Sequence, residues 1–115
     1  MAIAERLADQ FHAATLSGDV DTLRSILAPD VTFAGPLAEA SGVEECIAGL
    51  VEMSRTIVTN EVLVRLSDNK DALIWSAVMT ASAPPIQAAT WLHIRDDRIT
   101  MIRTVFDPGR LNKAA

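Results

Sequence analysis

Residues 72–107, ALIWSAVMTASAPPIQAATWLHIRDDRITMIRTVFD, decide the fold because they contain three long apolar runs in succession. The runs cover residues 72–83, 86–95 and 98–107, and Pro84-Pro85 and Asp96-Asp97 separate them. Runs of this composition are typical of β-strands, and connections this short join antiparallel neighbours. The stretch therefore predicts three consecutive antiparallel strands.

Helical periodicity dominates the sequence before this stretch. Asp19 is expected to cap a second helix that ends before Pro29, and Ser41 with Glu44 forms the S-x-x-E capping box of a third. The expected elements are, in order, a helix over 3–17, the helix between Asp19 and Pro29, a strand over 31–34, the helix that begins at Ser41, and a strand over 61–67. Together they predict an α+β fold, in which a cone-shaped, curved antiparallel β-sheet wraps around about three helices from the N-terminal half.

The composition predicts a single domain over residues 1–115 that is rich in apolar side chains. Hydrophobic residues make up 50% of the chain and charged residues only 22%. We expect the surplus apolar surface to line a ligand cavity or a subunit interface. The net charge is −5 and no run of Lys or Arg occurs, so nucleic acid is not an expected partner.

The cellular location is predicted from features that the sequence lacks. No apolar run reaches the ~20 residues that span a bilayer, and the first residues do not have the pattern of a signal peptide. Cys46 is the only cysteine, so no internal disulfide forms, and we expect a buried thiol. We therefore expect a cytoplasmic protein that does not bind membranes.

Both faces of the last strands carry apolar residues, which bears on the oligomeric state. In residues 86–95, for example, Trp91 and His93 alternate with Leu92 and Ile94. A sheet with one solvated face would alternate more cleanly between apolar and polar residues. We therefore expect a second copy of the chain to cover the outer face, giving a homodimer.

Three segments of the chain resemble the nuclear transport factor 2-like superfamily, and its SnoaL-like branch in particular. They are Leu16–Leu23 (LSGDVDTL), Leu27–Phe33 (LAPDVTF) and Asp97-Arg98-Ile99 running on to Val105-Phe106-Asp107-Pro108. The resemblance covers nearly the whole chain and implies the fold described above. This superfamily includes ketosteroid isomerases, limonene epoxide hydrolases, scytalone dehydratases and polyketide cyclases, so the fold does not decide the activity.

Two catalytic sets of the superfamily are absent at the matching positions. Ketosteroid isomerases use a tyrosine, an aspartate base and a second acid, where this chain has Phe11, Gly35 and Trp91. Limonene epoxide hydrolases use an arginine and two aspartates, where it has Ala89, Trp91 and Thr104. The resemblance therefore does not imply either activity.

The candidate catalytic residue is His93, which is expected to face into a pocket. Its imidazole titrates near neutral pH, which suits a general acid or base. The expected ligand-binding residues are Trp91, Thr104, Phe11, Phe33, Met79, Ile102 and Phe106. Two alternatives remain: His93 makes only a structural hydrogen bond at the mouth of the fold, or the apolar side chains meet and leave no cavity. His12 is expected to be exposed, and no spacing of metal ligands or cofactor motif occurs.

Two functions follow from these expectations. The first is an enzyme, an isomerase, cyclase or dehydratase, that binds a small hydrophobic molecule of polyketide or terpenoid type and moves a proton with His93. The second is a non-catalytic homodimeric module that binds a ligand or assists another protein. A cavity beside His93 would favour the first.

Overall fold

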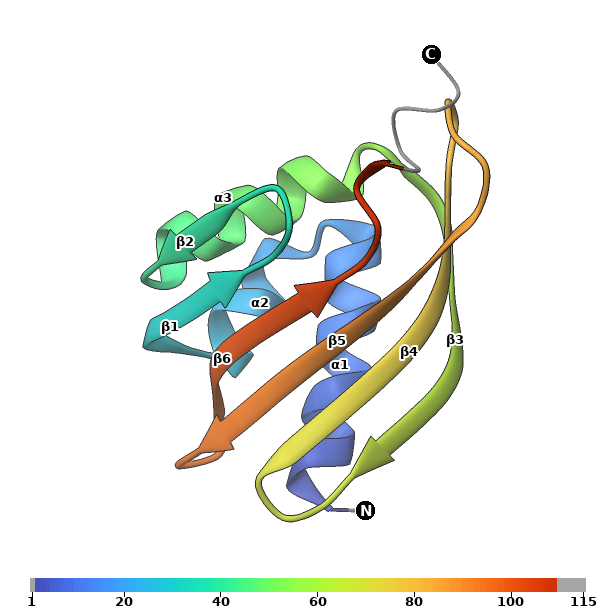
Figure 1. Ribbon diagram of the computed structural model, residues 1–115. Helices are drawn as coiled ribbons and strands as arrows, with labels where there is room; N and C mark the ends of the chain where they lie inside the picture. The colour runs from blue at the N-terminus through green and yellow to red at the C-terminus, as the bar shows by residue number, and fades with distance from the viewer. Residues whose placement is uncertain (1, 110–115) are drawn as a thin grey trace.

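The computed structural model describes residues 2–109, which form three helices and a six-stranded sheet (Figure 1). The helices are α1 (Ile3–Ser17), α2 (Val20–Ile26) and α3 (Val43–Ser54). The strands are β1 (Leu27–Ala34), β2 (Glu39–Ser41), β3 (Ile57–Ser67), β4 (Asp71–Thr80), β5 (Ile86–Arg95) and β6 (Arg98–Val105). None of the helices in residues 2–109 is long and apolar enough to cross a bilayer.

The sheet is curved and mixed, in the order β2-β1-β6-β5-β4-β3. All neighbouring pairs are antiparallel except β1 and β6, which run parallel. The α+β prediction is confirmed, but the expectation of a purely antiparallel sheet is wrong at this one pair. The pair joins segments far apart in the sequence, so no turn between them reveals their direction.

The last three strands form the meander that the sequence predicts. Asp96 and Asp97 have φ angles of 53° and 62°, as the two-residue turn of a tight hairpin requires. Strands β4 and β6 end at Thr80 and Val105, a few residues earlier than expected. The predicted strand over 61–67 is also longer, because β3 begins at Ile57, directly after α3.

The first two helices follow the predicted start and stop signals except at the end of α2. Gly18 ends α1 with a φ of 72°, which a residue without a Cβ adopts at little cost. The Asp19 carboxylate caps α2 by accepting a hydrogen bond from the Thr22 amide at 3.2 Å. The chain turns into β1 already at Leu27, so Pro29 lies inside the strand and does not end the helix.

The region around residue 41 differs most from the prediction. Strand β2, which pairs with β1, was not among the expected elements. Gly42 is the N-cap of α3, and the Ser41 amide donates to Glu45 at 3.2 Å. Glu44 instead forms an ion pair with Arg24 at 2.7 Å. The predicted capping box is therefore wrong, because Ser41 is part of a strand.

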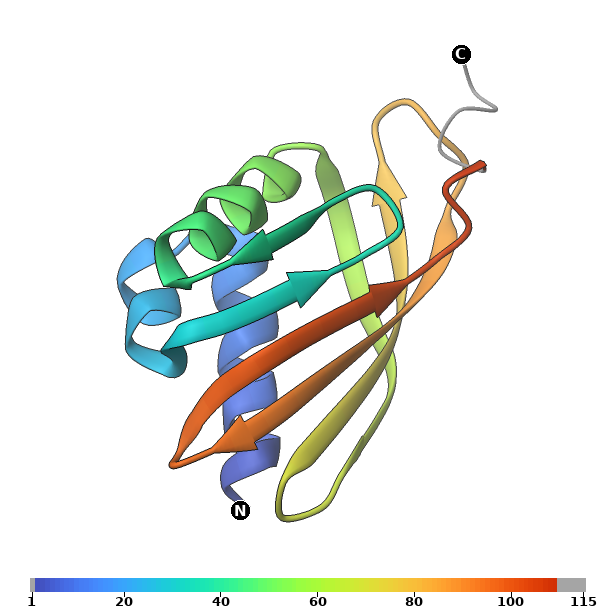
Figure 2. The same cartoon turned by 60° about the vertical axis from the view of Figure 1, so that its left-hand side comes forward.

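All three helices lie on the same side of the sheet, inside its curve (Figure 2). The core forms between them and the inner face of the sheet, where Leu23, Leu27, Leu92, Ile99 and Ile102 are almost completely buried. The thiol of Cys46 is buried in the same core, as expected, and burial raises its pKa. The opposite face of the sheet carries no helix in either ribbon view.

The structure reverses the predicted orientation of β4 and β5. In β5, Ile86, Ala88, Leu92 and Ile94 point into the core, whereas Trp91 on the other face is 42% exposed. In β4, Ile74 and Ser76 are buried. The expectation that Trp91, His93 and Met79 face inward is therefore wrong, because side chains of the opposite parity fill the core.

Candidate functional site

A cavity of about 110 Å³ lies between α1, α3 and the inner face of the sheet. Its apolar wall includes the buried side chains Phe11, Leu50, Ile74 and Ile86. The exposed residue Thr56 also lines it, so the cavity opens to solvent beside the connection from α3 to β3. A concave, mainly apolar site with a few polar groups is typical of small-molecule binding.

A hydrogen bond and a set of ion pairs between α1 and β3 hold one wall of the cavity in place. His12 Nε2 lies 2.9 Å from the backbone carbonyl oxygen of Asn60. Closer to the start of α1, Arg65 of β3 pairs with Glu5 at 2.8 Å and also with Asp9. These contacts fix the helix across the strand, so the side chains that α1 directs at the sheet have defined positions.

His12 is the one titratable side chain among the described residues that line the cavity. A backbone carbonyl only accepts hydrogen bonds, so Nε2 must carry the proton that it donates to Asn60. In the neutral ring, Nδ1 is then an acceptor, and it makes no hydrogen bond to residues 2–109. The ring can therefore accept a proton or a hydrogen bond at this atom.

Several polar atoms of the lining are buried without a partner. Thr15 Oγ1, Asn60 Oδ1 and Thr80 Oγ1 are shielded from solvent and make no hydrogen bond within the described part of the chain. By contrast, the hydroxyls of Thr90 and Thr104 lie 3.2 Å apart and satisfy each other. Buried polar groups are nearly always hydrogen-bonded, so three unpaired atoms around one cavity require an explanation.

The predicted ligand-binding residues divide into two groups. Phe11, Thr104 and Phe106 line the cavity. Of the others, Ile102 is completely buried in the core, and Phe33 packs against that core without lining the cavity. Met79 is 41% exposed on the outer face of the sheet.

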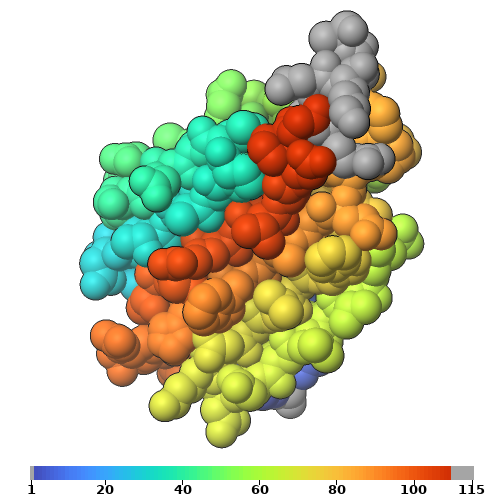
Figure 3. All heavy atoms as spheres, in the orientation of Figure 1, coloured from blue at the N-terminus to red at the C-terminus, as the bar shows by residue number. Residues whose placement is uncertain are grey.

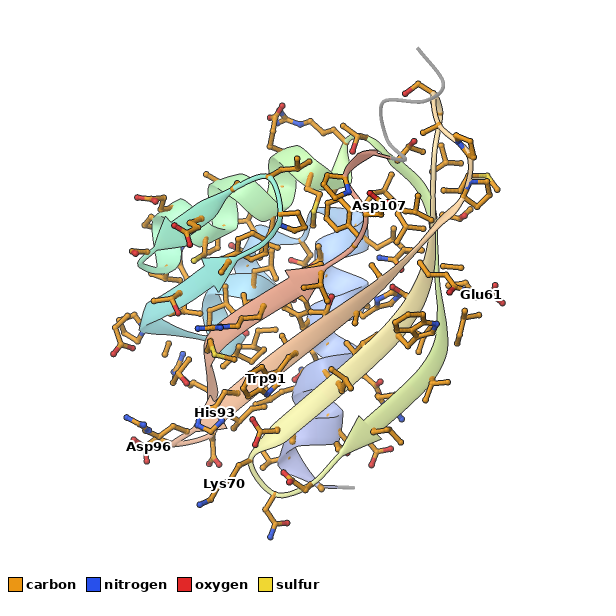
Figure 4. All side chains as sticks on the ribbon, viewed as in Figure 1. Glu61, Lys70, Trp91, His93, Asp96 and Asp107 are labelled. Carbon is orange, nitrogen blue, oxygen red and sulfur yellow. The ribbon has the colours of Figure 1, made fainter. Side chains whose placement is uncertain are left out.

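Trp91 and His93 lie outside the cavity, on the outer face at one end of β5 (Figure 4). Asp71 of β4 connects them: its Oδ1 accepts from Trp91 Nε1 and contacts His93 Nδ1, each at 2.8 Å. The hydrogen bond to His93, and then that to Trp91, lowers the pKa of the Asp71 carboxyl. The structure thus gives His93 an acidic partner, but it does not bring the pair to the cavity.

The sequence contains a signal for His12 that the prediction missed. Phe11, His12 and Thr15 lie at helical spacing, so His12 shares a turn with two residues that face the sheet. No three His, Cys, Asp or Glu side chains in residues 2–109 are grouped to hold a metal ion.

Comparison with known proteins agrees with the architecture. A family model described as SnoaL-like domain matches residues 8–102. No curated protein matches the chain significantly. A crystal structure from Kribbella flavida has a TM-score of 0.91 and 28% sequence identity, and the match covers 99% of this chain and 94% of that one.

Two further solved structures share the fold at lower identity. A steroid delta-isomerase from Pseudomonas aeruginosa has a TM-score of 0.82 and 18% identity, with 99% of this chain and 87% of that one covered. A putative polyketide cyclase from Sinorhizobium meliloti has a TM-score of 0.77 and 22% identity, with 86% and 93% covered. The family match spans most of the sequence, so the chain belongs to the SnoaL-like domain family, with a nuclear transport factor 2-like fold.

Proposed function

We propose that this chain binds a small hydrophobic molecule in the cavity between α1, α3 and the sheet. The observation that carries this proposal is the set of unpaired polar atoms, Thr15 Oγ1, Asn60 Oδ1 and Thr80 Oγ1, in a mainly apolar lining. A buried polar atom without a partner costs roughly 1–3 kcal/mol. A bound molecule with one polar group recovers part of this cost and buries its apolar part against Phe11 and Leu50.

The finer proposal is that the bound molecule is polyketide- or terpenoid-like and undergoes isomerisation, cyclisation or dehydration. Each of these reactions moves a proton, and His12 is the one side chain among the described residues of the cavity lining that can act as a general acid or base. The hydrogen bond from Nε2 to Asn60 orients the ring and leaves Nδ1 to take the proton. The role that the sequence suggested for His93 thus passes to His12, because His12 lines the cavity.

The alternative is a homodimeric binding module without catalysis. The outer face of the sheet supports this alternative. No helix covers the outer face of the sheet in the view of Figure 3. This face exposes several large apolar side chains. They include Leu66, Leu73, Trp75, Met79, Trp91 and Val105, which are 41–65% exposed. Contiguous apolar surface of this kind marks an interface, and a second copy of this face is the occupant that we propose.

A thermal-shift screen against small hydrophobic alcohols and ketones tests the binding proposal. A ligand at a hundred times its Kd stabilises the folded chain by about 2.7 kcal/mol, which raises the Tm by several degrees. If no compound shifts the Tm, the cavity is not a ligand site. The variant His12→Gln separates the two functions, because it should retain binding and lose turnover of any compound that the wild type converts.

A further inference from the structure

We propose that the ligand of this cavity is a neutral molecule no larger than about one six-membered ring, carrying a single hydroxyl group. This inference rests on the proposed function and narrows its substrate class. It selects the smallest terpenoid- or polyketide-like alcohols and excludes fused-ring compounds. Three properties of the cavity carry it: its volume, the absence of charge in its lining, and the position of its unpaired polar atoms.

The volume sets the upper limit on size. A dry apolar cavity of roughly 150 Å³ is enough to hold one benzene ring. The cavity here is smaller, about 110 Å³, so one six-membered ring is the upper limit of what its enclosed part holds. Pockets for drug-sized molecules are several times larger, roughly 300–1,000 Å³. A ligand with two or more fused rings would have to displace Phe11, Leu50 or Ile86, which are held in the packed interior, or leave a ring in the solvent opening beside Thr56.

The lining excludes a charged ligand. It contains no Asp, Glu, Lys or Arg among the described residues, and His12 is its one ionisable group. An ion that leaves water for such a site loses its hydration without gaining a counter-charge. A carboxylate or an ammonium group is therefore disfavoured, and the ligand is neutral.

The unpaired polar atoms gather at one part of the wall. On the sheet, Asn60 is the register partner of Val78, and Thr80 follows Val78 on the same face, so Asn60 and Thr80 are diagonal neighbours. His12 of α1 contacts the backbone of Asn60, and Thr15 lies one helical turn further along. These groups include both donors and acceptors, and a hydroxyl, which donates and accepts, satisfies two of them at once.

A series of alcohols of increasing size tests the limit on volume. Binding of cyclohexanol and of 2-decalol, which has two fused rings, is measured by NMR titration of the full chain. We expect cyclohexanol to bind at least tenfold more tightly than 2-decalol, although 2-decalol is the more hydrophobic of the two. If 2-decalol binds as tightly, the limit on size is wrong and the proposed function stands. If neither alcohol binds, both the inference and the proposed function are wrong.

The variants Thr15→Val and Thr80→Val test the recognition of the hydroxyl. Each replaces an unpaired hydroxyl by a methyl group of the same shape, and affinities for cyclohexanol and methylcyclohexane are compared. We expect the ratio of the two affinities to shift about fivefold to tenfold toward methylcyclohexane in at least one variant. Thr59→Val, on the exposed outer side of β3 opposite Met79, is the matched control and should leave the ratio unchanged. A ratio that stays constant in both cavity variants overturns the assignment of the hydroxyl.

Discussion

Replacing Thr15 by Val should stabilise the ligand-free protein, although it removes a polar group from a helix. Thr15 is only 8% exposed, and its Oγ1 makes no hydrogen bond within the described residues. A buried hydroxyl in this state costs roughly 1–3 kcal/mol, and the methyl that replaces it adds about 0.8 kcal/mol of apolar burial. Thr and Val have similar helix propensities, so that contribution cancels.

We therefore expect the free energy of unfolding of Thr15→Val to rise by about 2–4 kcal/mol. For a chain of this length, roughly 4 °C per kcal/mol is typical, so the Tm should rise by about 8–16 °C. Urea denaturation followed by far-UV circular dichroism measures the first quantity, and calorimetry the second. Saturating cyclohexanol should reduce the difference between the two proteins, because the variant loses a partner of the ligand.

The matched control is the same change at a threonine whose hydroxyl is paired. Thr22 Oγ1 donates to Asp19 Oδ2 at 2.7 Å, so Thr22→Val removes a hydrogen bond at the start of α2. We expect this variant to lose roughly 0.5–1.5 kcal/mol of stability. Opposite signs at the two positions would support the reasoning. If Thr15→Val is as destabilising as Thr22→Val, the Thr15 hydroxyl has a partner and the explanation of the cavity fails.

Three further predictions concern the core, the outer face and acid stability. Ile86→Ala should cost roughly 2–5 kcal/mol of stability and enlarge the cavity, so that 2-decalol binds more tightly than to the wild type in the same NMR titration. Trp75→Glu, on the exposed face, should convert a dimer to a monomer in sedimentation velocity, and a monomeric wild type would contradict the proposed interface. Hydrogen bonds from His93 and Trp91 lower the pKa of the Asp71 carboxyl in the folded protein. The ionised carboxylate therefore stabilises the fold at pH values above its unfolded pKa, near 3.8. This stabilisation is lost as the pH falls through the pKa of Asp71 in the folded state, which is lower. Urea titrations from pH 7 to pH 2 should therefore show a wild-type advantage over Asp71→Asn that is constant above about pH 4 and shrinks as the pH falls further toward pH 2. A difference that stays constant down to pH 2 would argue against this pairing.

The sequence predicted which helices and strands form better than it predicted which face of each strand is buried. Local signals were read correctly, because each depends on residues that are adjacent in the sequence. They are the hairpin turn at Asp96-Asp97, the end of α1 at Gly18 and the N-cap of α2 at Asp19. Strand β2 and the parallel pairing of β1 with β6 were missed, because they depend on contacts between distant segments. Such contacts leave no pattern in the residues that make them.

The candidate site was predicted only in part for a related reason. A strand with apolar residues on both faces does not show by alternation which side is buried. Trp91 and Met79 lie on a face that is apolar yet exposed, so their hydrophobicity led to the wrong prediction that they face inward. Phe11, Thr104 and Phe106 do line the cavity, because each belongs to a face that meets the interior.

The position of β6 has a consequence for how the protein is made. This strand is the last of the sheet to be synthesised, yet it lies near the middle, between β1 and β5. Its residues Ile99 and Ile102 are completely buried among side chains from both neighbours and from the helices. A nascent chain that ends before residue 98 has two separate sheet fragments with exposed inner edges. The core can therefore close only after β6 has left the ribosome, and until then the unpaired strand edges of both fragments can pair with other chains.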